Sequence, residues 1–174
     1  MTQGIELILG GARSGKSSYA EKRAQLSGRA VHFIATATAE DTEMAARIAA
    51  HRQQRSAQWT THEVPLQLAD ALRACAAAER CILVDCLGLW LSNLLHAGGS
   101  TFTHERQALL DTLPTLPGRV LLVSNEVGGG LVPTNDLARR FVDELGWLNQ
   151  AVARCCRHVV LLVAGLPLTL KDTP

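Results

Sequence analysis

Residues 10–17 read Gly-Gly-Ala-Arg-Ser-Gly-Lys-Ser and directly follow the largely apolar run Ile5 to Leu9. This spacing matches the pattern G-x-x-x-x-G-K-[ST], which forms a phosphate-binding loop between a strand and a helix. The glycines allow backbone N–H groups to point inward, so a phosphate can sit there without meeting a Cβ atom. Lys16 supplies a charge between the β- and γ-phosphates, and the Ser17 hydroxyl is placed to hold Mg²⁺. The predicted nucleotide-binding residues of this loop are Gly10, Gly11, Ala12, Arg13, Ser14, Gly15, Lys16 and Ser17.

Length and composition indicate one globular domain over residues 1–174, with 47% apolar and 19% charged residues. A net charge of +1 gives no electrostatic drive toward nucleic acid or an anionic membrane. We expect a cytoplasmic protein, because no signal segment is recognisable and the most apolar stretch, residues 81–95, is too short to cross a bilayer. The five cysteines form no C-x-x-C pair and have no histidine at zinc-ligand spacing, so we expect reduced thiols and assign them no metal.

Buried strands are predicted at residues 30–35, 81–85 and 119–124, and a shorter strand at 59–64, with helical segments between them. Thr103 is a plausible N-cap for one of these helices. Residues 158–164 and 166–170 resemble two strands joined at Gly165. The predicted fold is therefore α/β, a RecA-like P-loop NTPase three-layer sandwich whose mainly parallel sheet carries an antiparallel C-terminal hairpin at its edge.

Ligands of such sheets bind at the carboxyl ends of the strands. This rule gathers the phosphate-binding loop, residues 36–39, Asp85 and residues 125–132 around one cleft. Asp85 ends a buried strand, as does the acid that holds Mg²⁺ in phosphate-loop enzymes. The alternative for Asp85 is an ordinary N-cap of the next helix. Glu126 is the rival acid, and the sequence leaves open which of the two lies nearer the metal.

A predicted helix over residues 40–55 carries Glu43, Arg47, His51 and Arg55 at every fourth position. The two arginines would depress the pKa of His51, keep one of its nitrogens free for attack on phosphorus, and neutralise a phosphate. The alternative is a solvent-facing histidine in a charged stripe, and the residues alone favour that alternative.

Five blocks of sequence follow one another over nearly the whole chain: residues 10–17, Asp41-x-Glu43-Met44-x-x-Arg47-Ile48-x-x-His51-Arg52, Val84-Asp85-Cys86-Leu87-x-Leu89-Trp90, Ser124-Asn125-Glu126-Val127-Gly128-x-Gly130-x-Val132-Pro133, and Arg140-Phe141-x-Asp143-x-x-Gly146-x-x-Asn149-Gln150. Together they resemble the bifunctional adenosylcobinamide kinase / adenosylcobinamide-phosphate guanylyltransferase family of cobalamin synthesis. The resemblance implies phosphorylation of adenosylcobinamide with ATP or GTP. It also implies transfer of GMP from GTP, through a guanylylated histidine, to give adenosylcobinamide-GDP and pyrophosphate.

The resemblance places the guanylylated histidine at His51, and the phosphate-binding loop itself predicts Lys16 as a catalytic residue. Beyond the phosphate-binding loop, it implies nucleotide contacts from Ala35, Thr36, Ala37, Arg52, Gln53, Gln54, Arg55, Glu63 and Asp85. Mg²⁺ would be held by Ser17 and Asp85. Adenosylcobinamide and its phosphate are the implied partners, and a homotrimer the implied assembly. Gly88 departs from the family pattern, where we expect a threonine.

Two other functions remain compatible with the phosphate-binding loop. One is a single-activity small-molecule kinase in which His51 is structural. The other is a nucleotide-dependent switch, although no Asn/Thr-Lys-x-Asp guanine-specificity element follows the later strands. The residues do not identify the corrinoid site, and the loop at Gly128 to Gly130 is only a candidate for its neighbourhood.

Overall fold

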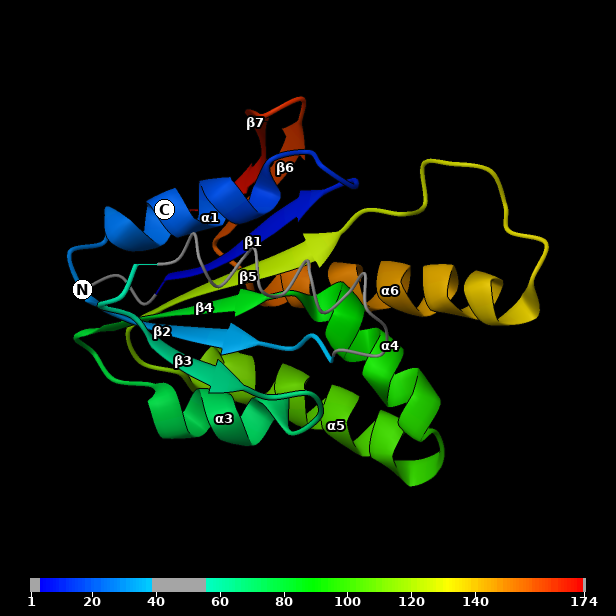
Figure 1. Ribbon diagram of the computed structural model, residues 1–174, viewed down its shortest axis with the longest axis horizontal. Helices are drawn as coiled ribbons and strands as arrows, with labels where there is room; N and C mark the ends of the chain where they lie inside the picture. The colour runs from blue at the N-terminus through cyan, green and yellow to red at the C-terminus, as the bar shows by residue number, and fades with distance from the viewer. Residues whose placement is uncertain (1–3, 39–55, 174) are drawn as a thin grey trace.

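The computed structural model describes residues 4–38 and 56–173. In this part of the chain the strands form one sheet in the order β3-β2-β4-β5-β1-β6-β7 (Figure 1). The strands are β1 (Gly4–Gly10), β2 (Ala30–Ala35), β3 (Thr60–Glu63), β4 (Arg80–Asp85), β5 (Arg119–Asn125), β6 (His158–Val163) and β7 (Leu166–Asp172). The helices are α1 (Lys16–Gln25), α3 (Leu68–Cys75), α4 (Leu87–Ala97), α5 (Gly99–Thr112), the 3₁₀ turn η1 (Leu113–Thr115) and α6 (Asp136–Cys155). The helix predicted over residues 40–55 lies outside the described residues.

The strand pairing confirms the predicted sheet. All neighbours from β3 to β6 pair in parallel, whereas β6 and β7 pair antiparallel. The turn between β6 and β7 consists of Ala164 and Gly165, whose φ angles are 52° and 78°. Positive φ at both central residues is the geometry of the tight hairpin turns that match the twist of the strands. The carboxyl ends of β1, β2, β3, β4 and β5 therefore meet at one edge of the sheet.

The sheet separates two layers of helices (Figure 1). Helix α1 covers one face, where Ile8, Phe33 and Leu83 belong to the buried core. Helices α3, α4, α5 and α6 lie on the other face, where Leu7 and Ile34 are buried. Neighbouring residues of a strand point to opposite faces, so a strand buried on both sides needs an almost continuous apolar run. This requirement explains why β1, β4 and β5 were recognisable in the sequence.

Helix α5 begins earlier than the sequence predicted. Thr103 lies inside the helix and is not its N-cap, because α5 starts at Gly99 with Gly98 at the N-cap position. Gly98 and Gly99 have φ angles of 63° and 55°, which let the chain turn directly from α4 into α5. Phe102 is then buried in the first turn. Among the described helices, none is both long enough and apolar enough to cross a membrane.

A buried carboxylate joins α1 to the sheet. Glu6 is only 2% exposed, and its oxygens accept hydrogen bonds from Arg23 at 2.8 Å and from Arg119 at 3.1 Å. The hydrogen bond from Arg23 to Glu6 raises the pKa of that guanidinium above its usual value. Because a buried charge is costly unless it is paired, the hydrogen bonds from the two arginines compensate the burial of the Glu6 carboxylate.

Replacing Glu6 by glutamine removes the negative charge between two arginines. We expect the free energy of unfolding to fall by about 2 kcal/mol, less than for a fully buried pair because both guanidinium groups reach solvent. In urea unfolding the midpoint should fall with an unchanged slope. Asp70→Asn is the matched control, since its pair with Arg73 is exposed and its loss should change stability by less than about 0.5 kcal/mol. Equal effects of the two substitutions would contradict the role given to Glu6.

Candidate active site

The loop of residues 10–17 wraps as its sequence requires. Gly15 has a φ of 93° and Arg13 a φ of 55°, and Lys16 is the first residue of α1. Lys16 Nζ donates to Gly11 O at 3.0 Å, so the ammonium group is folded over the loop. The first turn of a helix leaves N–H groups unpaired and carries partial positive charge. The loop therefore presents both a cation and backbone donors, as a phosphate site needs.

Close packing fixes the shape of this loop. A Cβ atom on Gly10 would overlap Ser14 Oγ, and one on Gly15 would lie 3.2 Å from Gly165 Cα. The turn of the β6–β7 hairpin also contacts the loop, because Gly165 N donates to Ser14 O at 2.9 Å. Among the described residues, Ser14 Oγ is buried without a hydrogen-bond partner. An unpartnered buried hydroxyl is uncommon, and a phosphate oxygen in the loop would satisfy it.

Three predicted site residues lie side by side at the carboxyl ends of β2, β3 and β4. Ala35 pairs with Glu63 on one side and with Asp85 on the other. Ala35 and Asp85 are half-buried, whereas Glu63 is exposed. All three lie at the same edge of the sheet as the phosphate-binding loop, although β5 separates β4 from β1.

Thr36 is fully buried, and its hydroxyl is used by the backbone of the neighbouring strand. Thr36 Oγ1 donates to Cys86 O at 2.7 Å and accepts from Cys86 N at 2.9 Å. Asn93 Nδ2 donates to Thr36 O at 2.8 Å, which ties the same loop to α4. The Thr36 side chain thus positions the segments after β2 and β4. Sequence spacing gave no sign of this contact or of the role of Asn93.

Cys86 lies beside the site but is not a nucleophile. Burial, followed by the nearby negative charge of Asp85, raises the pKa of the Cys86 thiol to about 12, so the thiol stays protonated at neutral pH. The positive charge of Lys16 lowers the pKa of the same thiol, but by less.

Asn125, at the end of β5, occupies the space beside Gly88. A Cβ atom on Gly88 would lie 2.8 Å from Asn125 Oδ1, so a larger residue requires the Asn125 side chain to move. Asn149 Nδ2 donates to Asn125 O at 3.0 Å, and Ser124 Oγ donates to Asn149 Oδ1 at 2.6 Å. The glycine that departs from the predicted pattern therefore fits the packing of this strand end.

The two candidate acids differ in their surroundings. Glu126 is exposed, and its Oε1 accepts the backbone N–H of Gly128 at 2.8 Å. The backbone N–H of Glu126 donates to Gly10 O, so this residue also supports the phosphate-binding loop. The Asp85 carboxylate is half-buried and accepts no hydrogen bond from the part of the chain that the structure describes. Asp85 and Ser17 offer the oxygen ligands that Mg²⁺ prefers.

Several of the remaining predicted residues lie in a stretch that the structure does not describe. His51, Arg52, Gln53, Gln54 and Arg55 lie outside the described residues, as do Glu43 and Arg47. Ala37 follows Thr36 at the site edge and is half-buried.

Comparison with known proteins assigns the chain to a family. Residues 6–170 match the CobU family model, described as cobinamide kinase / cobinamide phosphate guanyltransferase. The chain is 58% identical over 170 residues to a bifunctional adenosylcobalamin biosynthesis protein CobP of Pseudomonas aeruginosa, with 97% of this chain and 98% of the relative covered. It is 39% identical to the bifunctional adenosylcobalamin biosynthesis protein CobU of Salmonella typhimurium, with 95% and 98% covered.

Solved structures resemble the fold at low sequence identity. A protein from Pyrococcus horikoshii matches with a TM-score of 0.58 and 9% identity, covering 98% of this chain and 87% of that one. The RadB recombinase matches with a TM-score of 0.50 and 14% identity, covering 91% and 73%. These neighbours confirm the RecA-like α/β fold that the sequence predicted. The match along residues 6–170 and the identity to the curated relatives show more than a fold: the chain belongs to the CobU family of bifunctional cobinamide kinase / cobinamide phosphate guanyltransferases.

Proposed function

We propose that both reactions of the family use one nucleotide site, in which residues 10–17 hold the triphosphate of either ATP or GTP. The geometry of this loop carries the proposal, because it combines the Lys16 ammonium group, the first turn of α1 and the unpartnered hydroxyl of Ser14. Residues 35–37, Glu63 and Asp85 lie at the same edge and complete the nucleotide contacts. Residues 1–174 act as one domain in this proposal.

In the kinase reaction, the γ-phosphoryl group passes to the aminopropanol hydroxyl of adenosylcobinamide, and the nucleoside diphosphate leaves. Lys16 neutralises charge on the phosphates as the bond to the leaving oxygen breaks. Ser17 and Asp85 would hold Mg²⁺, which supplies further charge neutralisation when bound. The support is the chemistry of these two oxygen donors, and that the Asp85 carboxylate accepts no hydrogen bond from the described residues.

In the guanylyl transfer, a nitrogen of His51 attacks the α-phosphorus of GTP, and pyrophosphate leaves. The phosphoramidate bond then breaks when the phosphate of adenosylcobinamide phosphate attacks the same phosphorus, which gives adenosylcobinamide-GDP and frees the histidine. Arg52, Gln53, Gln54 and Arg55 contact the nucleotide in this proposal. Its support is the motif shared with the family around His51.

The loop after β5 is the proposed neighbourhood of the corrinoid. Leu131 is 98% exposed and Val132 is 79% exposed, directly after Gly128 to Gly130 and at the carboxyl edge of the sheet. Large exposed apolar side chains beside a site indicate a binding surface, and a corrin ring offers an apolar edge.

We also propose a cytoplasmic homotrimer, by resemblance to the family. The outer strand of the sheet supports an assembly, since Leu166, Leu168 and Leu170 of β7 are each more than half exposed. An apolar edge strand is an unfavourable surface for an isolated molecule. Sedimentation at micromolar concentration measures the assembly directly.

Labelled GTP tests the histidine assignment without any corrinoid present. The α-labelled nucleotide should leave label on the protein that is labile in acid and stable in base, as a phosphoramidate is, and γ-labelled GTP should leave none. His51→Ala should abolish the label, whereas His96→Ala, a control far along the chain, should retain it. Label that persists in His51→Ala would refute this role. Absence of label from the unaltered protein would favour a single-activity kinase.

Removal of the lysine tests whether one site serves both reactions. We expect Lys16→Ala to lower kcat/KM of phosphorylation and of guanylylation alike, each by about 100-fold or more, because both must hold a triphosphate. Lys22→Ala, a lysine at the far end of α1, is the control and should leave both rates near normal. Loss of only one reaction in Lys16→Ala would indicate two separate nucleotide sites.

The Mg²⁺ requirement of variants distinguishes whether Asp85 or Glu126 binds the metal. Asp85→Asn should raise the Mg²⁺ concentration needed for half-maximal rate by about tenfold or more, since it removes a carboxylate ligand. Glu126→Gln should change this requirement much less, because its carboxylate is turned to Gly128 N. The opposite order would assign the metal to Glu126.

A further inference from the structure

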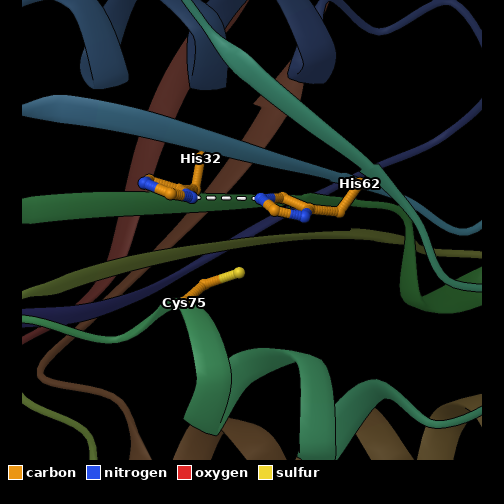
Figure 2. Close-up of side chains that lie close together, drawn as sticks. All are labelled: His32, His62 and Cys75. Atoms are coloured by element: carbon orange, nitrogen blue, oxygen red, sulfur yellow. Dashed lines mark hydrogen bonds between the residues drawn. The ribbon is translucent and has the colours of Figure 1, made fainter.

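Three potential metal ligands meet on the face of the sheet that packs against α3, away from the phosphate-binding loop. They are His32 of β2, His62 of β3 and Cys75, the last residue of α3 (Figure 2). One ligand atom from each lies within 4.8 Å of the other two. His32 Nδ1 and His62 Nε2 are 3.0 Å apart, and Figure 2 shows the Cys75 sulfur pointing toward the two rings.

The sheet register and the helix packing create this cluster. Thr60 pairs with His32, and His62 pairs with Ile34, so the two histidines lie on the same face of adjacent strands. Leu72 of α3 is buried against this face, which brings the end of the helix under the strands. Cys75 is 4% exposed, whereas both histidines are half-buried. The ligands are far apart in sequence, which is why spacing alone did not predict a site.

We propose that His32, His62 and Cys75 bind a zinc ion, with a fourth position left for water. Two imidazoles and one thiolate are the donors that zinc prefers, and Mg²⁺ and Ca²⁺ prefer oxygen. The proposal does not depend on the nucleotide site, because no residue is shared between the two.

The present geometry is close to the one that zinc requires. The centroids of the two imidazole rings are 5.3 Å apart, and the ring planes differ by 9°. Because His32 Nδ1 and His62 Nε2 are only 3.0 Å apart, the rings meet nearly edge to edge. Tetrahedral zinc separates two nitrogen ligands by about 3.3 Å and needs each ring to turn by about 35° toward the third ligand. The χ2 wells of histidine are broad, so this turn keeps each side chain near its rotamer.

The charges near the cluster act in both directions. Burial and, to a lesser extent, the positive charge of Arg80 lower the pKa of His32, which favours the neutral imidazole that can bind a metal. Burial raises the pKa of the Cys75 thiol, and the positive charge of Arg80 lowers it and so favours the thiolate. The same positive charge of Arg80 repels a bound cation. Binding therefore releases one proton from the Cys75 thiol, and each imidazole keeps one proton on the nitrogen that does not bind.

Such an ion would join three elements at the edge of the sheet. Strand β3 has only four residues and pairs on one side with β2. A zinc ion bound to the folded state alone, at a free concentration 100 times its Kd, would favour folding by about 100-fold through mass action. We infer that the site stabilises the edge strand rather than taking part in phosphoryl transfer.

Titration of the whole protein with Co²⁺ and with Zn²⁺, without nucleotide, tests the site. One equivalent of Co²⁺ should give the intense visible bands of tetrahedral coordination and a thiolate-to-metal charge-transfer band in the near ultraviolet, and Zn²⁺ should displace both. Cys75→Ser should abolish the charge-transfer band. His62→Asn should weaken binding by more than about 100-fold, beyond the loss expected for a residue outside the coordination sphere.

Matched controls separate this site from other thiols and from misfolding. Cys156→Ser replaces another buried thiol, and Cys86→Ser replaces the thiol beside the nucleotide site; both should retain the band. Far-ultraviolet circular dichroism shows whether each variant is folded. A folded Cys75→Ser that keeps the band, or an unaltered protein that binds no Co²⁺ with thiolate character, would overturn the proposal. Neither result bears on the labelling of His51.

Discussion

The phosphate-binding loop depends on one close approach between segments from opposite parts of the sequence. Gly165 N donates to Ser14 O, and a Cβ atom on Gly15 would lie 3.2 Å from Gly165 Cα, a tight contact. The left-handed backbone of Gly15 and the tight turn at Gly165 both require glycine. The loop is thus held between its own strand and the C-terminal hairpin.

Much of this arrangement was predictable because its determinants are local. The apolar runs of β1, β4 and β5, the spacing of residues 10–17 and the hairpin around Gly165 each identify an element from neighbouring residues. The rule that parallel strands collect ligands at their carboxyl ends predicted that Asp85 and residues 36–39 lie at the same edge of the sheet as the loop. The start of α5 was predicted wrongly, because burial of Phe102 outweighed the capping preference of Thr103.

Other parts of the site could not be predicted because they depend on contacts between distant residues. The hydroxyl of Thr36 binds the backbone of Cys86, and Asn125 fills the space beside Gly88. In the same way, the cluster of His32, His62 and Cys75 exists only because of the register of β2 and β3. A pattern search sees residue types at fixed spacing, whereas these contacts depend on which strands become neighbours.

The interior position of β1 in the sheet has a consequence for protein synthesis. Its partners on either side are β5 (Arg119–Asn125) and β6 (His158–Val163), so the strand that is made first must wait for two of the last. Until then the apolar side chains of Leu7 and Ile8 have no sheet to join. Contacts of such long sequence separation form slowly and leave the nascent chain open to aggregation. Chaperones that shield apolar segments on the ribosome would therefore matter most for the strand that leads into the phosphate-binding loop.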